Sequence, residues 1–433
     1  MKKKYITQLG TSYLQIAVSI LIPFLLTPYM IRSLGTELYG LWVLLNSIII
    51  YFGLASFGFG TTLLTEISQT ENLTMINKHI TTIFVFFMLI ILAVSFIFLI
   101  IMYYFDSFFI VGDAIVPIAK TTFAIMFLLF IVNFVTSIFH IVLFAKGLLY
   151  IQNMINIIQA IMTAVFMFGV LYYGYTVVAL AIVNLIVSSL MFVYVVHITK
   201  TKIKIIIRKH YFDSAILKKM LVPSMHYFLI TSTAMIILYS DNIILSSLAG
   251  LSSVAVYSIG YKLIDMSQQI LFKIVDVVIP DIAKLYGNRE YTKILKLHNK
   301  LLFYSLSLAV PGYAILFYWG LDMITLWVGE SFTIDQSIFN VFILFGLWHT
   351  WVHVSAIFIV AMGIHKETSY MGIVDAVLNI LISIILFQYY GVYGVAMGTL
   401  LAHILTNGWF SSYWFYHNIK LLIKEQEKDG VFT

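Results

Sequence analysis

Cysteine is absent from this sequence of 433 residues, and charged residues make up only 10% of it. The lack of cysteine excludes disulfide bridges, thiolate metal sites and a cysteine nucleophile, and it leaves the redox compartment open. A soluble globular domain carries charge on about a quarter of its residues, so the shortage of charge excludes that class. The chain is instead 61% hydrophobic, with a mean hydropathy of +1.00. We therefore expect a multi-pass membrane protein.

Apolar runs long enough to cross a bilayer, which takes about 20 helical residues, recur along the whole chain. The sequence predicts an all-α polytopic fold with about twelve transmembrane helices. Their approximate ranges are 10–31, 40–64, 80–104, 116–145, 150–172, 175–198, 221–248, 254–280, 299–327, 338–363, 368–389 and 392–416. The first run ends without a small-residue cleavage pattern, so we expect it to remain as a helix rather than be removed as a signal peptide.

Short motifs recur half a chain length apart. Tyr172-Tyr173-Gly174 recurs as Tyr389-Tyr390-Gly391, and Ala145-x-Gly147 recurs as Ala361-x-Gly363 at nearly the same offset. A near-constant offset predicts two similar halves, and duplicated bundles facing each other across a midplane site are typical of secondary transporters.

An even number of spans in each half makes the two repeats parallel, with a central cavity between them. We expect a six-helix bundle at 1–198, a basic cytoplasmic linker at 199–220, a second six-helix bundle at 221–417 and a cytoplasmic tail at 418–433. The loops are too short to bury a core of their own, so any chemistry must lie between helices.

The basic excess of 25 Lys and Arg over 19 Asp and Glu follows one face of the membrane. If the loops between the predicted spans are numbered from the N-terminus, nearly all cations outside the spans lie in the even-numbered loops and the two tails. Arg32 is the single cation in an odd-numbered loop. By the positive-inside rule both termini are cytoplasmic. No nucleic-acid partner is expected, because the cations follow the membrane rather than form a patch.

One predicted span carries a stripe of polar residues. At 100° per residue, these residues lie within about an 80° arc of one helix face. They are Ser258, Lys262, Asp265, Gln269, Lys273 and Asp276. A polar stripe inside a membrane has to face protein or water, because lipid offers no hydrogen-bond partners.

Two interpretations of this stripe stay open. Lys262–Asp265 and Lys273–Asp276 can be intrahelical i,i+3 ion pairs that hold the bundle together. Alternatively, the stripe lines a hydrated cavity in which Lys262 and Lys273 turn toward an anionic substrate. Both interpretations hold if the pairs open when substrate arrives.

Further ionisable residues are candidates for an interfacial or ion-coupling role. Arg32, at the end of the first span, is either an interfacial anchor or a cation at the cavity mouth. Asp241 is expected either to pair with Lys262 or to cap its own helix, and Asp375, which replaces Gln159 of the first half, is a candidate proton or cation site.

His349 and His353 have the i,i+4 spacing of metal ligands, but no third ligand accompanies them, so we expect packing or a proton relay rather than a metal. Lys120 lies close enough to the end of its span to reach the interface.

The stretch Leu34-Gly35-Thr36-Glu37-Leu38-Tyr39-Gly40-Leu41 and the later Asp241-Asn242-Ile243-Ile244-Leu245 resemble the polysaccharide-transporter flippases. Pro280-Asp281-Ile282-Ala283 and Tyr390-Gly391-Val392-Tyr393-Gly394-Val395-Ala396 extend the resemblance over nearly the whole chain. These flippases share a superfamily with the multidrug and toxin extruders (MATE proteins) and the lipid-linked peptidoglycan precursor flippases. Members often have an acidic residue near the position of Ser56 and a basic one near that of Thr65; this chain has neither, which puts cavity roles of the second helix in doubt.

The resemblance implies a MATE-like fold that moves undecaprenyl-diphosphate-linked oligosaccharide repeat units across the bacterial cytoplasmic (inner) membrane by alternating access. The polymer served is an O antigen of lipopolysaccharide, a capsule or another surface polysaccharide. The implied partners are the lipid-linked oligosaccharide and membrane lipids, with a polysaccharide polymerase or assembly complex and a coupling ion, proton or sodium, as candidates. No cofactor or resident metal is expected.

Two other functions differ in what they require of the sequence. A MATE-like multidrug/cation antiporter of the same fold should favour an acidic cavity without prominent lysines. A membrane enzyme such as a polymerase or ligase needs a sizeable extracytoplasmic loop that the predicted spans do not leave. We therefore expect a transporter and not an enzyme.

Overall fold

The computed structural model describes residues 2–330 and 332–428, and within them the chain folds into helices with no strand. The first helices are α1 (Lys2–Gly53), η1 (Leu54–Ser56), α2 (Phe59–Ser68), α3 (Leu73–Tyr103), α4 (Phe105–Phe108), α5 (Val116–Ala145), α6 (Leu149–Tyr172), α7 (Val177–Lys202) and η2 (Lys209–Tyr211). They are followed by α8 (Ser214–Leu248), α9 (Leu251–Asp276), α10 (Ile279–Gly287), α11 (Tyr291–Val328), α12 (Gln336–Ala361), α13 (Lys366–Leu405) and α14 (Asn407–Lys428). The last part of the predicted tail, 429–433, lies outside the described residues.

The chain divides into two compact units. The first unit comprises Met1–Met235 and Ser246–Ala255, and the second comprises Ile236–Leu245 and Val256–Thr433. Each unit is built around one central helix.

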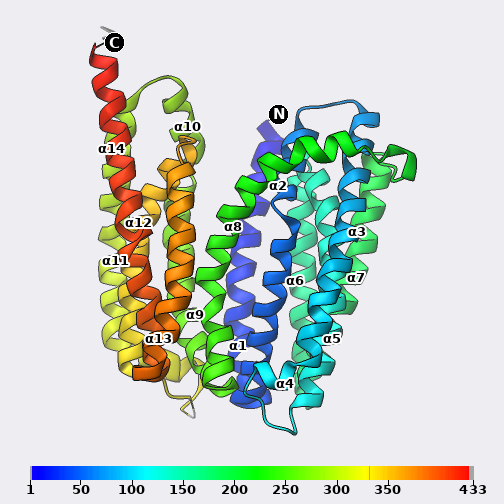
Figure 1. Cartoon of the computed structure of the whole chain (residues 1–433), viewed down its shortest axis with the longest axis vertical. Helices are drawn as coiled ribbons and strands as arrows, with labels where there is room; N and C mark the ends of the chain where they lie inside the picture. The colour runs from blue at the N-terminus through cyan, green and yellow to red at the C-terminus, as the bar shows by residue number, and fades with distance from the viewer. Residues whose placement is uncertain (1, 331, 429–433) are drawn as a thin grey trace. The chain divides into compact units, whose positions relative to one another are not determined.

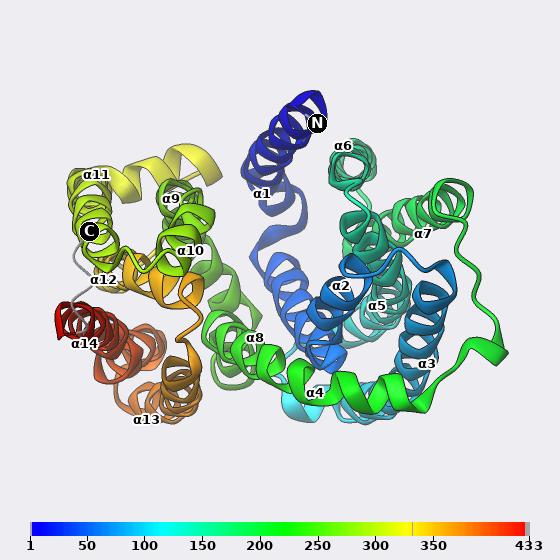
Figure 2. The ribbon, with the colours of Figure 1, turned by 90° about the horizontal axis from the view of Figure 1, so that it is seen from above.

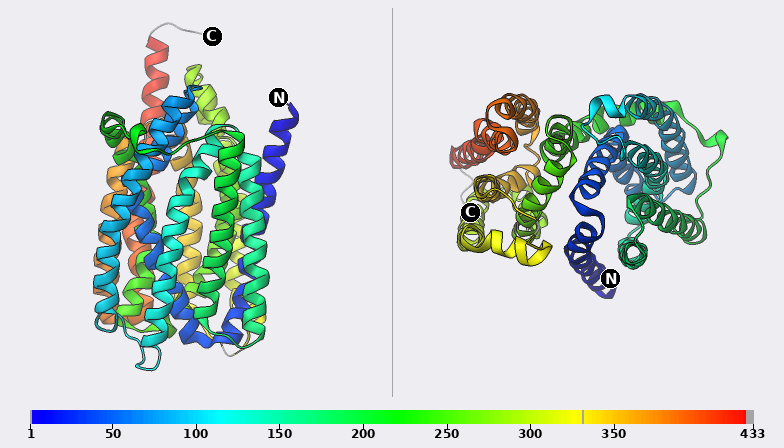
Figure 3. Two further views of the ribbon diagram at one scale, coloured as in Figure 1. Left: turned by 90° about the vertical axis from the view of Figure 1, so that its right-hand side faces the viewer. Right: turned by 90° about the horizontal axis from the view of Figure 1, so that it is seen from below.

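In the first unit, α5 is the central helix. It contacts α1, α2, α3, α6 and α7, and these helices run alongside one another (Figures 1 and 3). Phenylalanines hold this centre together: the rings of Phe98 and Phe127 stack at 4.1 Å, and those of Phe87 and Phe134 lie 4.3 Å apart. Aromatic pairs at such distances stabilise a bundle beyond the area that they bury.

In the second unit, α12 takes the corresponding place. It contacts α10, α11, α13 and α14, which surround it when the unit is seen end on (Figure 2). One end of this bundle is closed by an apolar core that includes Val354, Phe358, Phe415 and Ile419. The central helix of each unit thus comes from the same position in the predicted repeat.

Nine helical stretches among the described residues are long and apolar enough to cross a membrane. One of them, Gly10–Ser56, contains the first predicted span and most of the second, separated by a break at Gly35 (φ 78°, ψ 171°). The predicted spans 254–280 and 392–416 are not among these stretches; they fall on α9 and on the end of α13 with the start of α14. Large apolar side chains such as Leu92 (69% exposed) and Phe96 (67% exposed) cover the outside, as lipid-facing residues do. The predicted fold class is confirmed.

Two predicted spans are less regular than expected. The segment 40–64 is interrupted where Phe57 (φ 47°) and Gly58 (φ 71°) take left-handed backbone conformations between η1 and α2. The segment 392–416 breaks at Thr406 (φ −123°, ψ −108°), so α13 ends at Leu405 and α14 begins at Asn407. These short breaks lie inside apolar runs and leave the hydropathy unchanged, so hydropathy alone does not predict them.

The repeated Ala-x-Gly motif has the same structure in both units. Gly147 (φ 67°) and Gly363 (φ 73°) each follow a central helix, and each motif closes with a pair of backbone bonds. After the first central helix, Gly147 N donates to Phe144 O and Leu148 N donates to Leu143 O. After the second, Gly363 N donates to Val360 O and Ile364 N donates to Ile359 O. This is the Schellman helix end, which favours glycine because of its positive φ.

Candidate functional site in the second unit

The predicted polar stripe lies on one unbroken helix, α9. Ser258, Lys262, Asp265 and Gln269 are half-buried within the described residues. Farther along the helix, the Lys273 side chain is 48% exposed and Asp276 26%. The stripe is therefore at the edge of the second unit's core and becomes more accessible toward the end of α9.

The two predicted ion pairs on α9 differ. Lys273 Nζ lies 3.2 Å from Asp276 Oδ2, so that pair is confirmed. The Lys262–Asp265 pair is wrong: within the described chain, Lys262 Nζ has no carboxylate within 4.0 Å, and Asp265 instead accepts a 3.0 Å hydrogen bond from Gln269 Nε2. Lys262 therefore attracts Asp265 through charge but makes no direct contact with it, and its ammonium group can make a direct contact with another anion.

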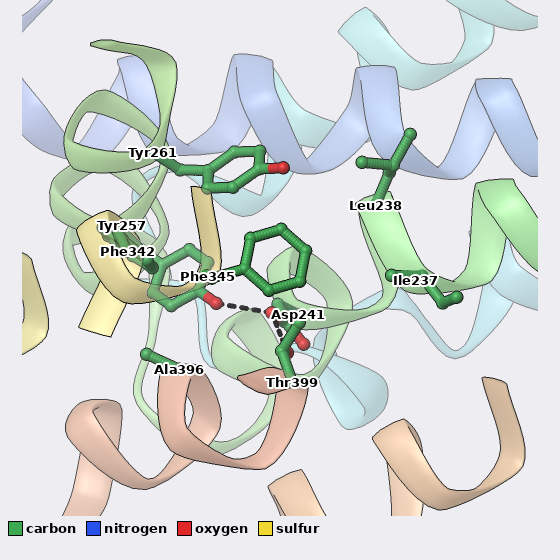
Figure 4. A pocket seen from close by; sticks show the side chains of 9 residues that line it. All are labelled: Ile237, Leu238, Asp241, Tyr257, Tyr261, Phe342, Phe345, Ala396 and Thr399. Carbon is green, nitrogen blue, oxygen red and sulfur yellow. Dashed lines mark hydrogen bonds between the residues drawn. The ribbon is translucent and has the colours of Figure 1, made fainter. Parts of the chain in front are cut away.

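Asp241 of α8 pairs with hydroxyl groups rather than with Lys262, which corrects that expectation. The Tyr257 hydroxyl and the Thr399 Oγ1, the latter at 2.7 Å, both donate to Asp241 Oδ2, and Figure 4 shows them converging on the carboxylate. Thr399 in turn accepts from Asn379 Nδ2 at 2.8 Å, and Ser240 Oγ donates to Asn379 Oδ1 at 2.9 Å. Residues from α8, α9 and both limbs of α13 are thus tied into one buried polar cluster.

A small cavity of about 20 Å³ adjoins this cluster. Tyr261, Phe342 and Phe345 form its aromatic wall, and Asp241 and Thr399 form its polar wall (Figure 4). Asp241 Oδ1 is buried and has no hydrogen-bond partner among the described residues. A space of this size admits one water-sized particle, and the unpartnered carboxylate oxygen would supply a ligand for it.

One turn away on the same two limbs of α13, Asp375 meets His403. Asp375 Oδ2 lies 2.8 Å from His403 Nδ1, and the side chains are 1% and 7% exposed. Asp375 Oδ1 and His403 Nε2 are buried without a partner among the described residues.

The two histidines predicted on α12 have separate partners. Gln268 Nε2 lies 3.3 Å from His349 Nδ1, and His353 Nε2 lies 3.0 Å from Asp276 Oδ1. No group of three or more His, Cys, Asp or Glu side chains in the part of the chain that the structure describes is arranged to hold a metal ion.

Two of the sequence candidates, Arg32 and Lys120, belong to the first unit. Arg32 is exposed on α1, shortly before the break at Gly35. Lys120 Nζ lies 3.1 Å from Asp106 Oδ1, and this hydrogen bond is the main reason that the pKa of Asp106 falls below its ordinary value. The Lys120 pair is exposed, as expected of an interfacial cation.

The sequence did not identify Thr399, His403 and Gln268 as site residues. Their partners lie on other helices, so no spacing within one helix reveals the contacts. The one available signal was that Thr399 and His403 follow each other at i,i+4, as do Asp375 and Asn379, which places two polar residues on one face of each limb of α13.

The architecture matches solved structures of membrane transporters along almost its full length. A multidrug resistance MATE family transporter of the MOP superfamily, in its inward-facing conformation, superposes with a TM-score of 0.81 at 14% identity, covering 97% of this chain and 99% of that one. The lipid II flippase MurJ, in an inward closed conformation, gives 0.73 at 18% identity over 96% and 87%. A MOP superfamily transporter from Pyrococcus furiosus, for which a binding pocket of reverse polarity is described, gives 0.63 at 13% identity over 97% and 96%.

At these identities the likeness shows the fold alone, which is that of MOP superfamily transporters and flippases. No curated protein matches the chain. The family model described as polysaccharide biosynthesis protein matches residues 9–286. Because this is more than half of the chain, the protein belongs to that family, and the resemblance inferred from the sequence motifs is confirmed. Family and fold together define a multi-pass membrane flippase or transporter.

Proposed function

We propose that this protein is a flippase that moves undecaprenyl-diphosphate-linked oligosaccharide repeat units across the cytoplasmic membrane for surface polysaccharide synthesis, such as O antigen or capsule. The observation that carries the proposal is the half-buried ammonium group of Lys262, on a polar helix face and without a carboxylate within 4.0 Å among the described residues. Membership of the polysaccharide biosynthesis family and the fold shared with a lipid II flippase support the same substrate class.

The charge of the substrate explains why cations belong on that face. A diphosphate is a dense anion, and taking it out of water without counter-charges costs many kcal/mol. Lys262 would meet the diphosphate first; Lys273 would follow by leaving Asp276, and Arg32 would contribute from the first unit. Gln269 and Ser258 would bind sugar hydroxyls, while the polyprenyl tail stays in lipid.

Alternating access would occur between a bundle at 1–198 and one at 221–417, with the basic segment 199–220 as the linker and both termini in the cytoplasm. The predicted distribution of lysines and arginines supports this orientation. A polymerase or assembly complex would receive the repeat unit on the far side.

A coupling ion, proton or sodium, would bind at the acidic residues of the second unit. Among Asp241, Asp265, Asp276 and Asp375, Asp241 has the best geometry for a small hard cation, because its unpartnered Oδ1 adjoins the 20 Å³ cavity and its other neighbours are hydroxyl oxygens.

The alternative is a MATE-like multidrug/cation antiporter, and the TM-score of 0.81 to a multidrug transporter favours it. An organic cation would be repelled by Lys262, so the two functions predict opposite effects of removing that charge. Lys262→Ala would weaken flipping of an anionic lipid and would leave or improve export of a cationic dye.

The test uses proteoliposomes that contain a fluorescent polyprenyl-diphosphate oligosaccharide, and follows the accessibility of its sugar to an external quencher. Wild type should flip the lipid, and Lys262→Ala should lose most of this activity. Lys300→Ala, which removes an exposed lysine beside Tyr304 on α11, is the matched control and should flip normally. Equal flipping by Lys262→Ala and wild type would overturn the role of Lys262, and no flipping by folded wild type would overturn the substrate.

A further inference from the structure

A row of three histidines connects two carboxylates inside the second unit. Asp375 Oδ2 lies 2.8 Å from His403 Nδ1, and the ring of His403 lies 5.4 Å from that of His349, measured between centroids. His353 follows His349 by one turn of α12 and places its Nε2 3.0 Å from Asp276 Oδ1. The row therefore leads from a carboxylate on α13 to one at the end of α9.

The two ends of this row differ in exposure. Asp375 is 1% exposed and His403 7%, whereas His353 reaches 17% and Asp276 26%. Asp276 is paired with Lys273, which is 48% exposed. One end of the row is thus buried in the core, and the other is partly exposed at the end of α9.

Aromatic rings enclose the histidines laterally. Phe272 stacks on His353 at 3.7 Å and meets the edge of His349 at 5.2 Å. Phe345 lies 5.3 Å from His349 and 5.6 Å from His403. These rings cover faces of the histidines with apolar surface, and a proton can move between the ring nitrogens that remain.

We propose that Asp375 and His403 together form a proton-binding site, and that His349, His353 and Asp276 are the path by which its proton exchanges with solvent. Binding adds one proton to the pair: a carboxylate beside a neutral imidazole becomes a carboxylate beside an imidazolium. A buried charge of −1 becomes an ion pair without net charge, which a low-dielectric core favours. The proton arrives and leaves through Asp375 Oδ1 and His403 Nε2, which are buried and have no hydrogen-bond partner among the described residues.

Titratable groups reach this site from several neighbouring helices, and their charges will modulate it. They are His349 and His353 of α12, Asp276 of α9, Asp241 of α8 and Tyr313 of α11. Asp241 is hydrogen-bonded to Thr399, one turn before His403, and the Tyr313 hydroxyl lies beside Gly346. The residues of α14 that are buried in the described structure are Gly408, Ser411, Ser412, Phe415 and Ile419, none of them titratable. Asp241 is the neighbouring carboxylate on the core side, so a cation there would weaken proton binding at the pair.

The pair suits a proton better than a metal ion. It offers one carboxylate and one imidazole, and no group of three or more His, Cys, Asp or Glu side chains among the described residues is arranged to hold a metal ion. The use of the bound proton to drive transport rests on the proposed function, but proton binding itself does not.

The first unit supplies the variant for testing this site. Gln159 occupies the position equivalent to Asp375, and its Nε2 donates to Ser188 Oγ at 3.0 Å. The double variant Asp375→Gln/His403→Ser therefore replaces the titratable pair with a hydrogen-bonding pair that this fold already uses. His298→Gln is the control, because His298 is equally buried but is held by Ser355 at 3.0 Å, outside the row.

Proton uptake by the purified protein is measured with a pH-indicator dye after a jump from about pH 8 to pH 5. Wild type and His298→Gln should bind one proton more than the double variant. His349→Gln/His353→Gln should still bind the proton of the Asp375–His403 pair, measured as the difference from the same variant that also carries Asp375→Gln/His403→Ser, but should bind it much more slowly than wild type. Equal uptake by wild type and the double variant would overturn the binding site, and equal rates in the double-histidine variant would overturn the path.

In proteoliposomes, a pH gradient should accelerate flipping by wild type, and the double variant should equilibrate the lipid without responding to the gradient. If wild type binds the proton but flips no lipid, the proposed substrate is wrong and the proton site stands. Flipping that the gradient accelerates equally in the double variant would overturn the coupling role of the pair.

Discussion

The two units make a polar contact at corresponding places in the repeat, but with different chemistry. In the first unit, Gln159 of α6 donates to Ser188 of α7, a contact that is neutral at any physiological pH. In the second, Asp375 replaces Gln159 and meets His403. The corresponding helix pair thus holds a neutral hydrogen bond in one unit and an ionisable pair in the other.

The helices that carry these contacts also approach each other differently. In the second unit, a Cβ on Gly398 would lie 2.6 Å from the Ser383 backbone, and a Cβ on Gly394 would lie 2.2 Å from Leu386 O. The repeat motif aligns Gly394 with Val177, a fully buried residue with a bulky side chain. The Gly-x-x-x-Gly pattern lets the two limbs of α13 touch backbone to backbone, as small residues do between membrane helices.

Removing the acidic partner in the second unit should have the largest effect. When the pair holds its proton, Asp375→Leu leaves the buried imidazolium of His403 without its carboxylate, and breaking a buried ion pair from one side costs about 3–5 kcal/mol. Gln159→Leu in the first unit removes one neutral hydrogen bond, which is worth about 1 kcal/mol. Thermal unfolding of the two purified variants in detergent measures the difference. Similar losses of stability would mean that the two contacts are equivalent despite their chemistry.

A methyl group between the limbs of α13 should have the next largest effect. Gly398→Ala places a carbon against the Ser383 backbone, and overpacking of this kind costs about 1–3 kcal/mol. The control is Gly169→Ala in α6, where a Cβ meets nothing within 4 Å, so helix propensity alone should leave stability equal or slightly higher. An unchanged unfolding temperature for Gly398→Ala would show that the limbs separate easily and that the close approach is not required.

Hydropathy predicted the helices well because apolar length is a property of each segment alone. The break at Gly35 was also predictable, since the apolar pattern pauses there. The change in direction at Thr406 was not, because it falls inside an apolar run and is set by packing: a Cβ on Gly408 would lie only 2.4 Å from His403 O.

For the candidate site, the sequence located the ionisable residues but not their partners. It selected Asp241 and Asp375 because carboxylates are rare in membrane spans. It paired Asp241 with Lys262 because they lie on consecutive predicted helices, whereas Thr399 arrives from a helix far along the chain. Contacts between distant helices depend on how the bundle closes, which no local pattern encodes.

A partly exposed ion pair in the first unit should have the smallest effect, which would support burial as the reason that Asp375 matters. Asp213 precedes α8, accepts a 3.0 Å bond from Ala215 N and lies 3.3 Å from Lys78 Nζ. The backbone bond from Ala215 and, after it, the bond from Lys78 lower the pKa of Asp213 below its ordinary 3.8. A carboxyl whose pKa is lowered by folding stabilises the folded state above that ordinary value and loses this contribution as the pH falls through the lowered pKa. At pH 7, Asp213→Asn should therefore unfold at a slightly lower temperature than wild type; the difference is small because water screens the pair. In strong acid the carboxyl group of wild type is protonated, so the two proteins should unfold at the same temperature. A decrease at pH 7 as large as that of Asp375→Leu would contradict burial as the cause of the difference between the two units.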